Sequence, residues 1–356
     1  RRRPLMQITL LVPELIWPEP DDRATLDSLN CPGLTTLLGR SRLQQRPPQS
    51  LEATLTDLFG VGGSLAYAAY RAHGEEPPLA LAEDCWLCAD PVHLRLHQER
   101  LILADGASLA VDLAEAEAIV ADFNRQFADV GCFHLKAADR WYLQLPRTTD
   151  LGRFDVLPLS VVAGRRVARQ LPEDHGLRWL RRLLNEAQML LHQHPVNEAR
   201  DRDGRPTINS LWLWGGGTLP AATDRVFSAV WGENLLARGL ARTAGALVDA
   251  LPAHASDWLA QIPRGGSHLL VLEALQAPVQ YEDGDAWRSA LQDLEQRWFA
   301  PLQKALARGA IGRLRLEAPT AYAALSWDAQ RSAQWKFWRR PLVLADTARA
   351  LAAGAR

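Results

Sequence analysis

The chain has 356 residues, of which 47% are hydrophobic and 23% are charged, with 40 basic residues against 41 acidic ones. This is the composition of a globular protein, and the length exceeds what one core usually supports, so two domains are expected. The near-neutral balance, without a basic stripe interleaved with aromatic residues, argues against nucleic acid as the main partner.

The first apolar stretch, Leu5 to Trp17, follows three arginines. A signal peptide would need an unbroken apolar region and a small-residue cleavage site, whereas Pro13 and Glu14 interrupt this one. We therefore expect a first buried strand over Gln7 to Val12. No run approaches the ~18 apolar residues of a membrane span, which predicts a cytoplasmic protein without membrane contact.

The elements that follow change character near Trp86. Helical patterns are predicted over residues 26–38, 51–59 and 64–73. Short strands are then predicted at 92–96, 100–103, 132–136 and 141–145, around a helix at 113–127. Short strands packed on one helix indicate a small α+β unit.

The second half alternates strands and helices. A helical face from Leu177 to Leu191 ends before Pro195. Strands are predicted at 211–214, 226–231, 268–272 and 313–317, with helices at 234–243 and 286–307. This alternation predicts a mostly parallel sheet with helices on both faces. We expect an α/β core made of residues 1–85 and 176–356, with an inserted α+β domain over 86–175.

The four cysteines, Cys31, Cys85, Cys88 and Cys132, are too few and too scattered for a disulfide scaffold. Cys85 and Cys88 have the spacing of a redox motif or of half a zinc site. No second close pair accompanies them, and their segment reads as a strand, so buried small hydrophobic residues are the favoured interpretation.

The most informative run lies between His194 and Pro220. It reads as a helix end, a polar loop, an apolar strand and a glycine turn, and it places Asn197, Arg200 and Asn209 on loops, where α/β proteins keep ligand contacts. These three residues are the candidate ligand-binding set, with Arg200 as a phosphate partner because its fork matches phosphate oxygens. The glycines 215–217 lack the Lys-Ser/Thr of a P-loop, so a tight turn is favoured over a phosphate cradle.

The same run resembles a stretch of the cofactor-independent phosphoglycerate mutases of the archaeal type, which are metal enzymes of the alkaline phosphatase superfamily. Asp105 to Tyr142 is similar to the small inserted domain of that family, and Ala237 to Gly245 to one of its helices. Overall the chain resembles a bacterial branch described as mutase-like or regulatory. The resemblance implies an alkaline-phosphatase-like sheet sandwiched by helices, with a small inserted α+β domain.

Enzymes of that family use a serine nucleophile facing two divalent cations, which lower its pKa and neutralise the transferred phosphoryl group. The family's first metal motif, Asp-Gly after the first strand, falls on Pro13-Glu14-Leu15. Its nucleophile motif falls on Ser50, but Leu51 stands where the neighbouring aspartate is expected. A serine before a helix is also an ordinary N-cap, which is the favoured interpretation of Ser50.

The remaining metal motifs match no better. One falls on Leu272 to Gln280, with no aspartate until Asp283 and Asp285, which also read as an acidic turn before a helix. The last falls on Leu316 to Thr320 and on Trp335 to Trp338. We therefore expect no metal site and no cofactor, because losing most ligands abolishes a site.

Three functions stay open. The first is a catalytically degenerate regulatory protein that binds a partner protein or a small phosphorylated molecule. The second is an active phosphomutase or phosphatase with two divalent cations, manganese or zinc, that uses Ser50 with Glu14, Asp283 and Asp285. The third is a scaffold with a docking patch near the C-terminus, formed by Trp327, Trp335, Trp338, Lys336, Arg339 and Arg340, for which core packing with a basic rim is the alternative.

Overall fold

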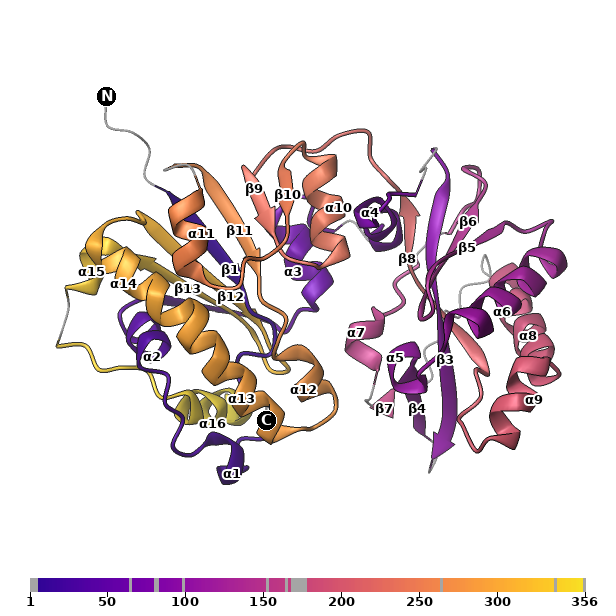
Figure 1. The fold of residues 1–356 in the computed structure, drawn as a ribbon, viewed down its shortest axis with the longest axis horizontal. Helices are drawn as coiled ribbons and strands as arrows, with labels where there is room; N and C mark the ends of the chain where they lie inside the picture. Colours follow the sequence, from indigo (N-terminus) through magenta and orange to yellow (C-terminus); the bar gives the residue numbers. More distant parts are fainter. Residues whose placement is uncertain are drawn as a thin grey trace. The chain divides into compact units, whose positions relative to one another are not determined.

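A computed structural model describes residues 6–63, 66–79, 83–97, 100–151, 154–163, 166–167, 178–262, 265–335 and 338–354. The chain divides into two compact units. Residues 1–62 and 224–356 form the core unit, and residues 63–223 form the inserted unit. Figure 1 colours the chain by sequence, from indigo at the N-terminus to yellow at the C-terminus. The boundaries expected at 85/86 and 175/176 differ from this division. Helix α8 (Arg178–His192) and strand β8 (Ser210–Thr218), both expected in the core, pack within the inserted unit.

The core unit is built on a seven-stranded sheet in the order β10-β9-β11-β1-β12-β13-β2. The strands are β1 (Gln7–Leu11), β2 (Arg42–Arg46), β9 (Ala229–Trp231), β10 (Leu247–Asp249), β11 (Ser267–Val271), β12 (Arg313–Pro319) and β13 (Ala324–Gln330). Strand β1 pairs in parallel with both β11 and β12, whereas β13 and β2 are antiparallel additions at one edge. The expected α/β class with a mostly parallel sheet is confirmed.

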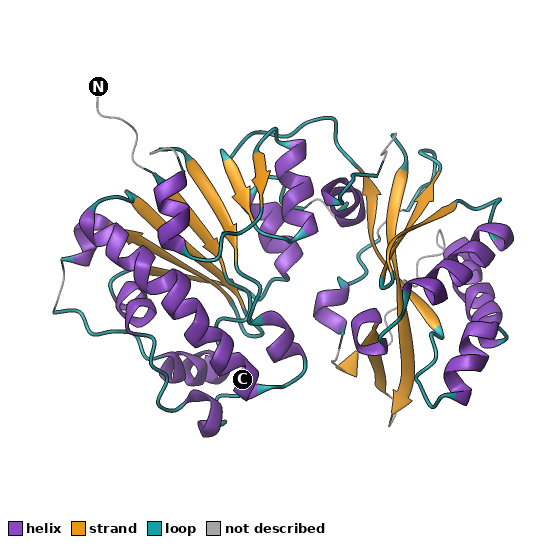
Figure 2. Ribbon diagram, in the orientation of Figure 1, coloured by secondary structure: helices purple, strands orange, loops and turns teal. Residues whose placement is uncertain are grey.

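Helices cover this sheet (Figure 2). They are α1 (Arg23–Leu26), α2 (Pro32–Gly39), α3 (Leu51–Leu58), α10 (Leu235–Thr243), α11 (Ala255–Gln261), α12 (Gln276–Gln280), α13 (Gly284–Leu294), α14 (Ala300–Arg308), α15 (Arg331–Gln334) and α16 (Leu344–Gly354). A π-helical turn, η2 (Glu295–Phe299), joins α13 to α14. Among the described residues, no helix has both the length and the apolar content to cross a bilayer.

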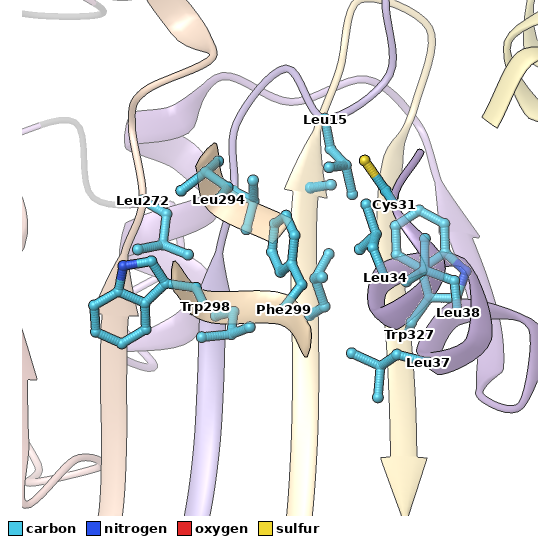
Figure 3. Packing of buried hydrophobic residues seen from close by; sticks show 14 of the residues in the cluster. Leu15, Cys31, Leu34, Leu37, Leu38, Leu272, Leu294, Trp298, Phe299 and Trp327 are labelled. Atoms are coloured by element: carbon cyan, nitrogen blue, oxygen red, sulfur yellow. The ribbon is translucent and has the colours of Figure 1, made fainter. Parts of the chain in front are cut away.

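The two faces of the sheet differ because successive side chains of a strand point to opposite faces. Ile8 and Leu10 of β1, with Leu314 and Leu316 of β12, lie in the main apolar core. Figure 3 shows this core, where Trp298 and Phe299 pack near Leu272 and Leu294, and α2 brings Leu34, Leu37 and Leu38 against Trp327. The residues between them, such as Thr9 and Arg315, face the other side, where α3 lies.

Helix α2 begins without a side-chain cap from its own N-cap residue, Cys31. Its cap comes from Glu295 of η2, whose carboxylate oxygens accept the backbone N–H groups of Gly33 at 2.7 Å and of Leu34 at 2.9 Å. These N–H groups have no partner within a helix, and a negative charge at a helix N-terminus is favourable. Burial, together with the nearby charge of Glu295, raises the pKa of the Cys31 thiol to about 12, against an opposing effect of Arg288.

The inserted unit is organised by one long strand, β3 (Cys85–His97). It pairs antiparallel with β6 and β4 along one side and with β8 along the other. The remaining strands are β4 (Arg100–Asp105), β5 (Cys132–Ala137), β6 (Arg140–Leu145) and β7 (Arg166–Val167). Its remaining helices are α4 (Tyr67–Gly74), α5 (Gly106–Leu109), α6 (Leu113–Gln126), α7 (Leu159–Val162) and α9 (Pro195–Arg202). This antiparallel sheet with helices is the expected small α+β arrangement.

A buried ion pair fastens α4 to this sheet. Arg71 makes a two-pronged contact with Asp90 of β3, at 2.8 and 3.0 Å, and the indole of Trp214 donates to the same carboxylate at 2.9 Å. The guanidinium also lies over the rings of Tyr142 and Trp214. Strand β8 approaches α4 closely at Gly215, which has φ 68°. A Cβ at this position would lie 2.9 Å from the Cβ of Tyr67. Residues 215–217 therefore belong to β8, not to the tight turn that was expected.

Gly33→Ala tests the packing at the start of α2. A Cβ at this position would lie 2.5 Å from the Cα of Ala300 and 2.7 Å from a carboxylate oxygen of Glu295. We expect a loss of about 1–3 kcal/mol in the free energy of unfolding, measured by urea denaturation. The control is Gly354→Ala in α16, where a Cβ would meet no atom within 4 Å. A Gly33→Ala protein as stable as the control would contradict the described packing.

Candidate functional site

Ligands of open α/β sheets bind at the carboxyl ends of the parallel strands. At that edge of the core unit, β11 is followed by Leu272-Glu273 and β9 by Gly232-Glu233-Asn234. Asn234 donates from Nδ2 to Glu273 Oε1 at 2.7 Å, and the buried Glu52 of α3 is close enough to influence that carboxyl. These residues form the polar edge of the sheet where the resemblance implies a metal centre.

Glu273 is an ionisable group of this edge whose pKa is shifted from its ordinary value. Burial raises its pKa, the Asn234 hydrogen bond acts against that shift, and the carboxylates of Glu52 and Glu233 add to it. The side chain therefore holds a proton more readily than an ordinary glutamate. The sequence interpretation passed over Glu273 in favour of Asp283 and Asp285, although its position directly after a buried strand was a usable signal.

Glu317 occupies the strand onto which the last metal motif of the resemblance falls. It is fully buried. Arg46 donates to its Oε2 at 3.0 Å, Ser326 donates to its Oε1 at 2.7 Å, and Arg315 forms an ion pair with it. Both carboxylate oxygens are thus bonded to donors of this chain. A carboxylate held in this way is not available as a ligand for a divalent cation.

Two residues of the active-enzyme hypothesis, Ser50 and Asp283, serve as helix caps. Ser50 is the N-cap of α3, and its hydroxyl accepts the N–H of Ala53 at 3.0 Å. Asp283 is likewise the N-cap of α13, accepting the N–H of Ala286 at 2.9 Å. Across the described ranges, no group of three or more histidines, cysteines, aspartates or glutamates is placed to hold a metal. The two caps, Ser50 and Asp283, thus use their side-chain oxygens within the chain.

The predicted ligand-binding residues all lie in the inserted unit. Asn197 is buried in α9, not on a loop, and its side chain bonds the backbone of Leu191 and Ile208 at 2.7–2.8 Å. Asn209 bonds the N–H and C=O of Leu94 at 2.7 and 2.9 Å. Its amide thereby extends the pairing of β8 with β3 by one residue. Both amides line a polar hollow, but their polar atoms are already bonded to the chain.

Arg200 also lies in α9, and it is fully buried. Its Nε donates to the carbonyl of Pro206 at 2.8 Å, and its other nitrogens bond Glu115 and the carbonyl of Leu109. Glu115 is also part of the capping box that begins α6. The guanidinium therefore joins α9 to the start of α6. These contacts weigh against Arg200 as a phosphate partner, while ligand binding by the set of three stays a prediction.

The tryptophans of the predicted docking patch separate into two groups. Trp327 of β13 is 1% exposed and belongs to the main core, so its place in the patch was wrong. Trp335 and Trp338 are 69% and 68% exposed. Arg339 and Arg340 beside them are exposed as well, and Lys336 lies outside the described residues.

The two cysteines with redox spacing, Cys85 and Cys88, are buried and lie on β3. Cys85 packs in the apolar core of the inserted unit, and residues three apart on a strand point to opposite faces. Their side chains therefore do not face each other, which agrees with their interpretation as small buried hydrophobic residues.

Several known proteins are similar to this chain in sequence. No protein-family model matches the chain. A probable 2,3-bisphosphoglycerate-independent phosphoglycerate mutase of Geobacter sulfurreducens is 30% identical over 131 residues, which are 34% of this chain and 31% of that protein. A mutase of the same description from Methanosarcina mazei is 21% identical over 60% of this chain and 54% of its own length. The chain thus matches less than two thirds of either relative.

Solved structures show the fold. The PH0037 protein from Pyrococcus horikoshii superposes with a TM-score of 0.59 at 16% identity, over 97% of this chain and 93% of that one. The cofactor-independent phosphoglycerate mutase from Thermoplasma acidophilum reaches a TM-score of 0.44 at 16% identity, over 96% and 94%. The sequence similarity confirms the resemblance to cofactor-independent phosphoglycerate mutases as a divergent one.

Replacing Arg200 by glutamine distinguishes a structural role from a ligand contact. Removing the guanidinium leaves the carbonyls of Pro206 and Leu109 without this donor, whereas Glu115 keeps its contact with Arg205. We therefore expect a loss of about 1–3 kcal/mol in the free energy of unfolding. The matched control is Arg202→Gln, an exposed arginine of the same helix, which should change stability by less than ~0.5 kcal/mol. Equal stability of the two variants, measured by urea denaturation, would contradict the structural role.

Proposed function

We propose that this chain is a phosphoglycerate-mutase-like protein without two-metal phosphoryl transfer, which acts by binding a partner protein or a small phosphorylated molecule. The observation that carries the proposal is the environment of Glu317. At a position where the resemblance implies metal ligands, the carboxylate is held by two arginines and a serine. The positive charge beside it therefore comes from guanidinium groups of the chain itself.

The chemistry of the sheet edge supports the same proposal. Two-metal phosphoryl transfer needs several hard oxygen and imidazole ligands, because the cations must activate the nucleophile and neutralise the phosphoryl charge together. Glu273, whose pKa is raised, sits close to Glu52 and Glu233 and is bonded by a neutral amide. Ser50 uses its hydroxyl oxygen to cap a helix, and a nucleophile would need a neighbouring base or cation.

Metal content is the first test. We expect the purified protein, incubated with manganese or zinc and then desalted, to retain far less than one ion per chain by elemental analysis. The reason is that the carboxylates of Glu273 and Glu317 already accept hydrogen bonds from other side chains of this protein. Two tightly held ions per chain, together with phosphoglycerate mutase or phosphatase activity, would support the enzyme hypothesis instead.

Two variants of Ser50 separate a cap from a nucleophile. Ser50→Ala should lower the free energy of unfolding by about 1 kcal/mol, while Ser50→Asp should keep it, because aspartate is an equally good N-cap. Both variants would abolish the activity of an enzyme that uses this hydroxyl. Activity in the wild type that disappears in Ser50→Asp, with unchanged stability, would overturn the proposal.

A second candidate function, protein docking, is favoured by the exposure of Trp335 and Trp338. The segment that carries them is attached to α2, since Arg40 donates to the carbonyl of Gln334 at 2.6 Å and the N–H of Leu342 donates to the carbonyl of Thr35 at 2.9 Å. Residues 329–345 include no aspartate or glutamate. Exposed aromatic residues with arginines are typical of interface anchors, and the charge favours an acidic partner.

The docking function is tested with a double variant, Trp335→Ala with Trp338→Ala. Proteins that co-purify with the wild type should be lost from this variant while its melting temperature is unchanged, because neither side chain is part of the core. Leu247→Ala is the control, because this leucine is 71% exposed but lies on β10, outside the segment that carries the two tryptophans. Equal recovery by the double variant and the control would rule out this patch as the docking surface.

A further inference from the structure

The core unit has a hollow of about 230 Å³ on the face of its sheet opposite the main apolar core. Its lining includes eight polar residues, namely Gln7, Thr9, Arg46, Thr54, Asp57, Ser267, Arg313 and Arg315. They come from β1, β2, α3, β11 and β12. Ser267, Arg313 and Arg315 lie in the amino-terminal halves of their strands, and Thr9 is the middle residue of β1. Neither Glu273 nor Ser50 lines the hollow.

Two of these arginines are held in place by one buried carboxylate. Glu317 is 1% exposed, whereas the side chains of Arg46 and Arg315, which it joins, are 36% and 38% exposed. One negative charge shared by two guanidinium groups leaves a net charge of +1 on these three residues, and Asp328 also interacts electrostatically with Arg315. The Glu317 carboxylate also restricts the rotation of both side chains, so less entropy is lost when a ligand binds them.

Both guanidinium groups retain N–H donors toward the hollow. Arg46 uses Nη2 for Glu317, and Arg315 uses Nε for Ser326 at 3.2 Å in addition to its ion pair with Glu317. Each guanidinium carries five N–H groups. Within the part of the chain that the structure describes, no other side chain or backbone acceptor is hydrogen-bonded to either of them. The hydroxyls of Thr9 and Ser267 add neutral donors on neighbouring strands.

The other charges of the hollow are already paired or exposed. Arg313 makes a two-pronged ion pair with Asp328, at 2.8 and 2.6 Å, which cancels its charge. Asp57 of α3 is exposed and accepts a hydrogen bond from Gln49 at 2.8 Å. Its charge opposes an anion, but solvent screens it more strongly than the partly buried arginines. The donors at the floor therefore favour an anion.

We propose that this hollow binds a phosphate group, free or as a small phosphate monoester, through Arg46 and Arg315. The planar fork of arginine matches phosphate oxygens, and two such forks, from β2 and β12, are fixed by one carboxylate. The volume is below that of pockets for drug-sized ligands, which favours a small molecule over a nucleotide. The site requires no metal, and it rests on the proposed binding of a small phosphorylated molecule, for which it names the residues.

The experiment is calorimetric titration at constant ionic strength with inorganic phosphate, glycerol 3-phosphate and glycerol. The wild type should bind at least one of the two phosphates and not glycerol, and the stronger of the two identifies the source of the phosphate group. Arg46→Gln and Arg315→Gln should each weaken binding about tenfold, because each removes charged hydrogen bonds. Arg349→Gln, an arginine of α16 in an exposed ion pair with Asp346, should bind like the wild type.

One further variant tests the sign of the charge effect. Asp57→Asn removes an exposed negative charge that lines the hollow and should strengthen phosphate binding. This effect is opposite in sign to those of Arg46→Gln and Arg315→Gln, so the proposal stays testable if either arginine variant does not fold. Absence of phosphate binding in the wild type, or equal binding by Arg46→Gln, Arg315→Gln and Arg349→Gln, would overturn the proposal.

Discussion

The core unit depends on the compensation of one buried carboxylate, that of Glu317. An ionised carboxylate removed from water without partners is destabilising by several kcal/mol. Its partners come from three strands: Arg46 from β2, Arg315 from β12 and Ser326 from β13. The edge strand β2, which pairs only with β13 among the described strands, is thereby also held by side-chain bonds.

The same carboxylate bears on both the proposed absence of a metal centre and the proposed phosphate pocket. Because its oxygens are bonded by donors of the chain, Glu317 supports the proposal that the chain works without a two-metal centre. Because it joins two partly exposed arginines, it would also fix the donors of the proposed phosphate pocket.

Sequence patterns predicted the class of the fold because burial imposes periodicity on strands and helices. They could not assign β8, since an apolar run such as Leu211–Trp214 predicts a strand but not its neighbour. The strand pairs antiparallel with β3 inside the inserted unit. For Trp327, the alternation with Leu325 and Ala329 was a usable signal of burial, because all three lie in the main core.

The candidate site was harder to predict, because its polar residues are explained by partners distant in the sequence. Arg200 bonds Glu115, which is 85 positions earlier, and Asn209 bonds Leu94, which is 115 positions earlier. Neither pairing leaves a local pattern. Arg315 and Glu317 are two residues apart on β12, but Arg46 joins them only when β2, β12 and β13 have assembled, so no motif marks all three.

The cap on α2 bears on the order in which the protein folds during its synthesis. Gly33 leaves the ribosome 262 residues before Glu295, the residue that accepts its N–H group. The inserted unit, by contrast, is one continuous segment, so all its own contacts are available once residue 223 has emerged. The contacts between residues 6–62 and residues 224–354 that complete the core unit therefore become available only after the whole inserted unit has been synthesised.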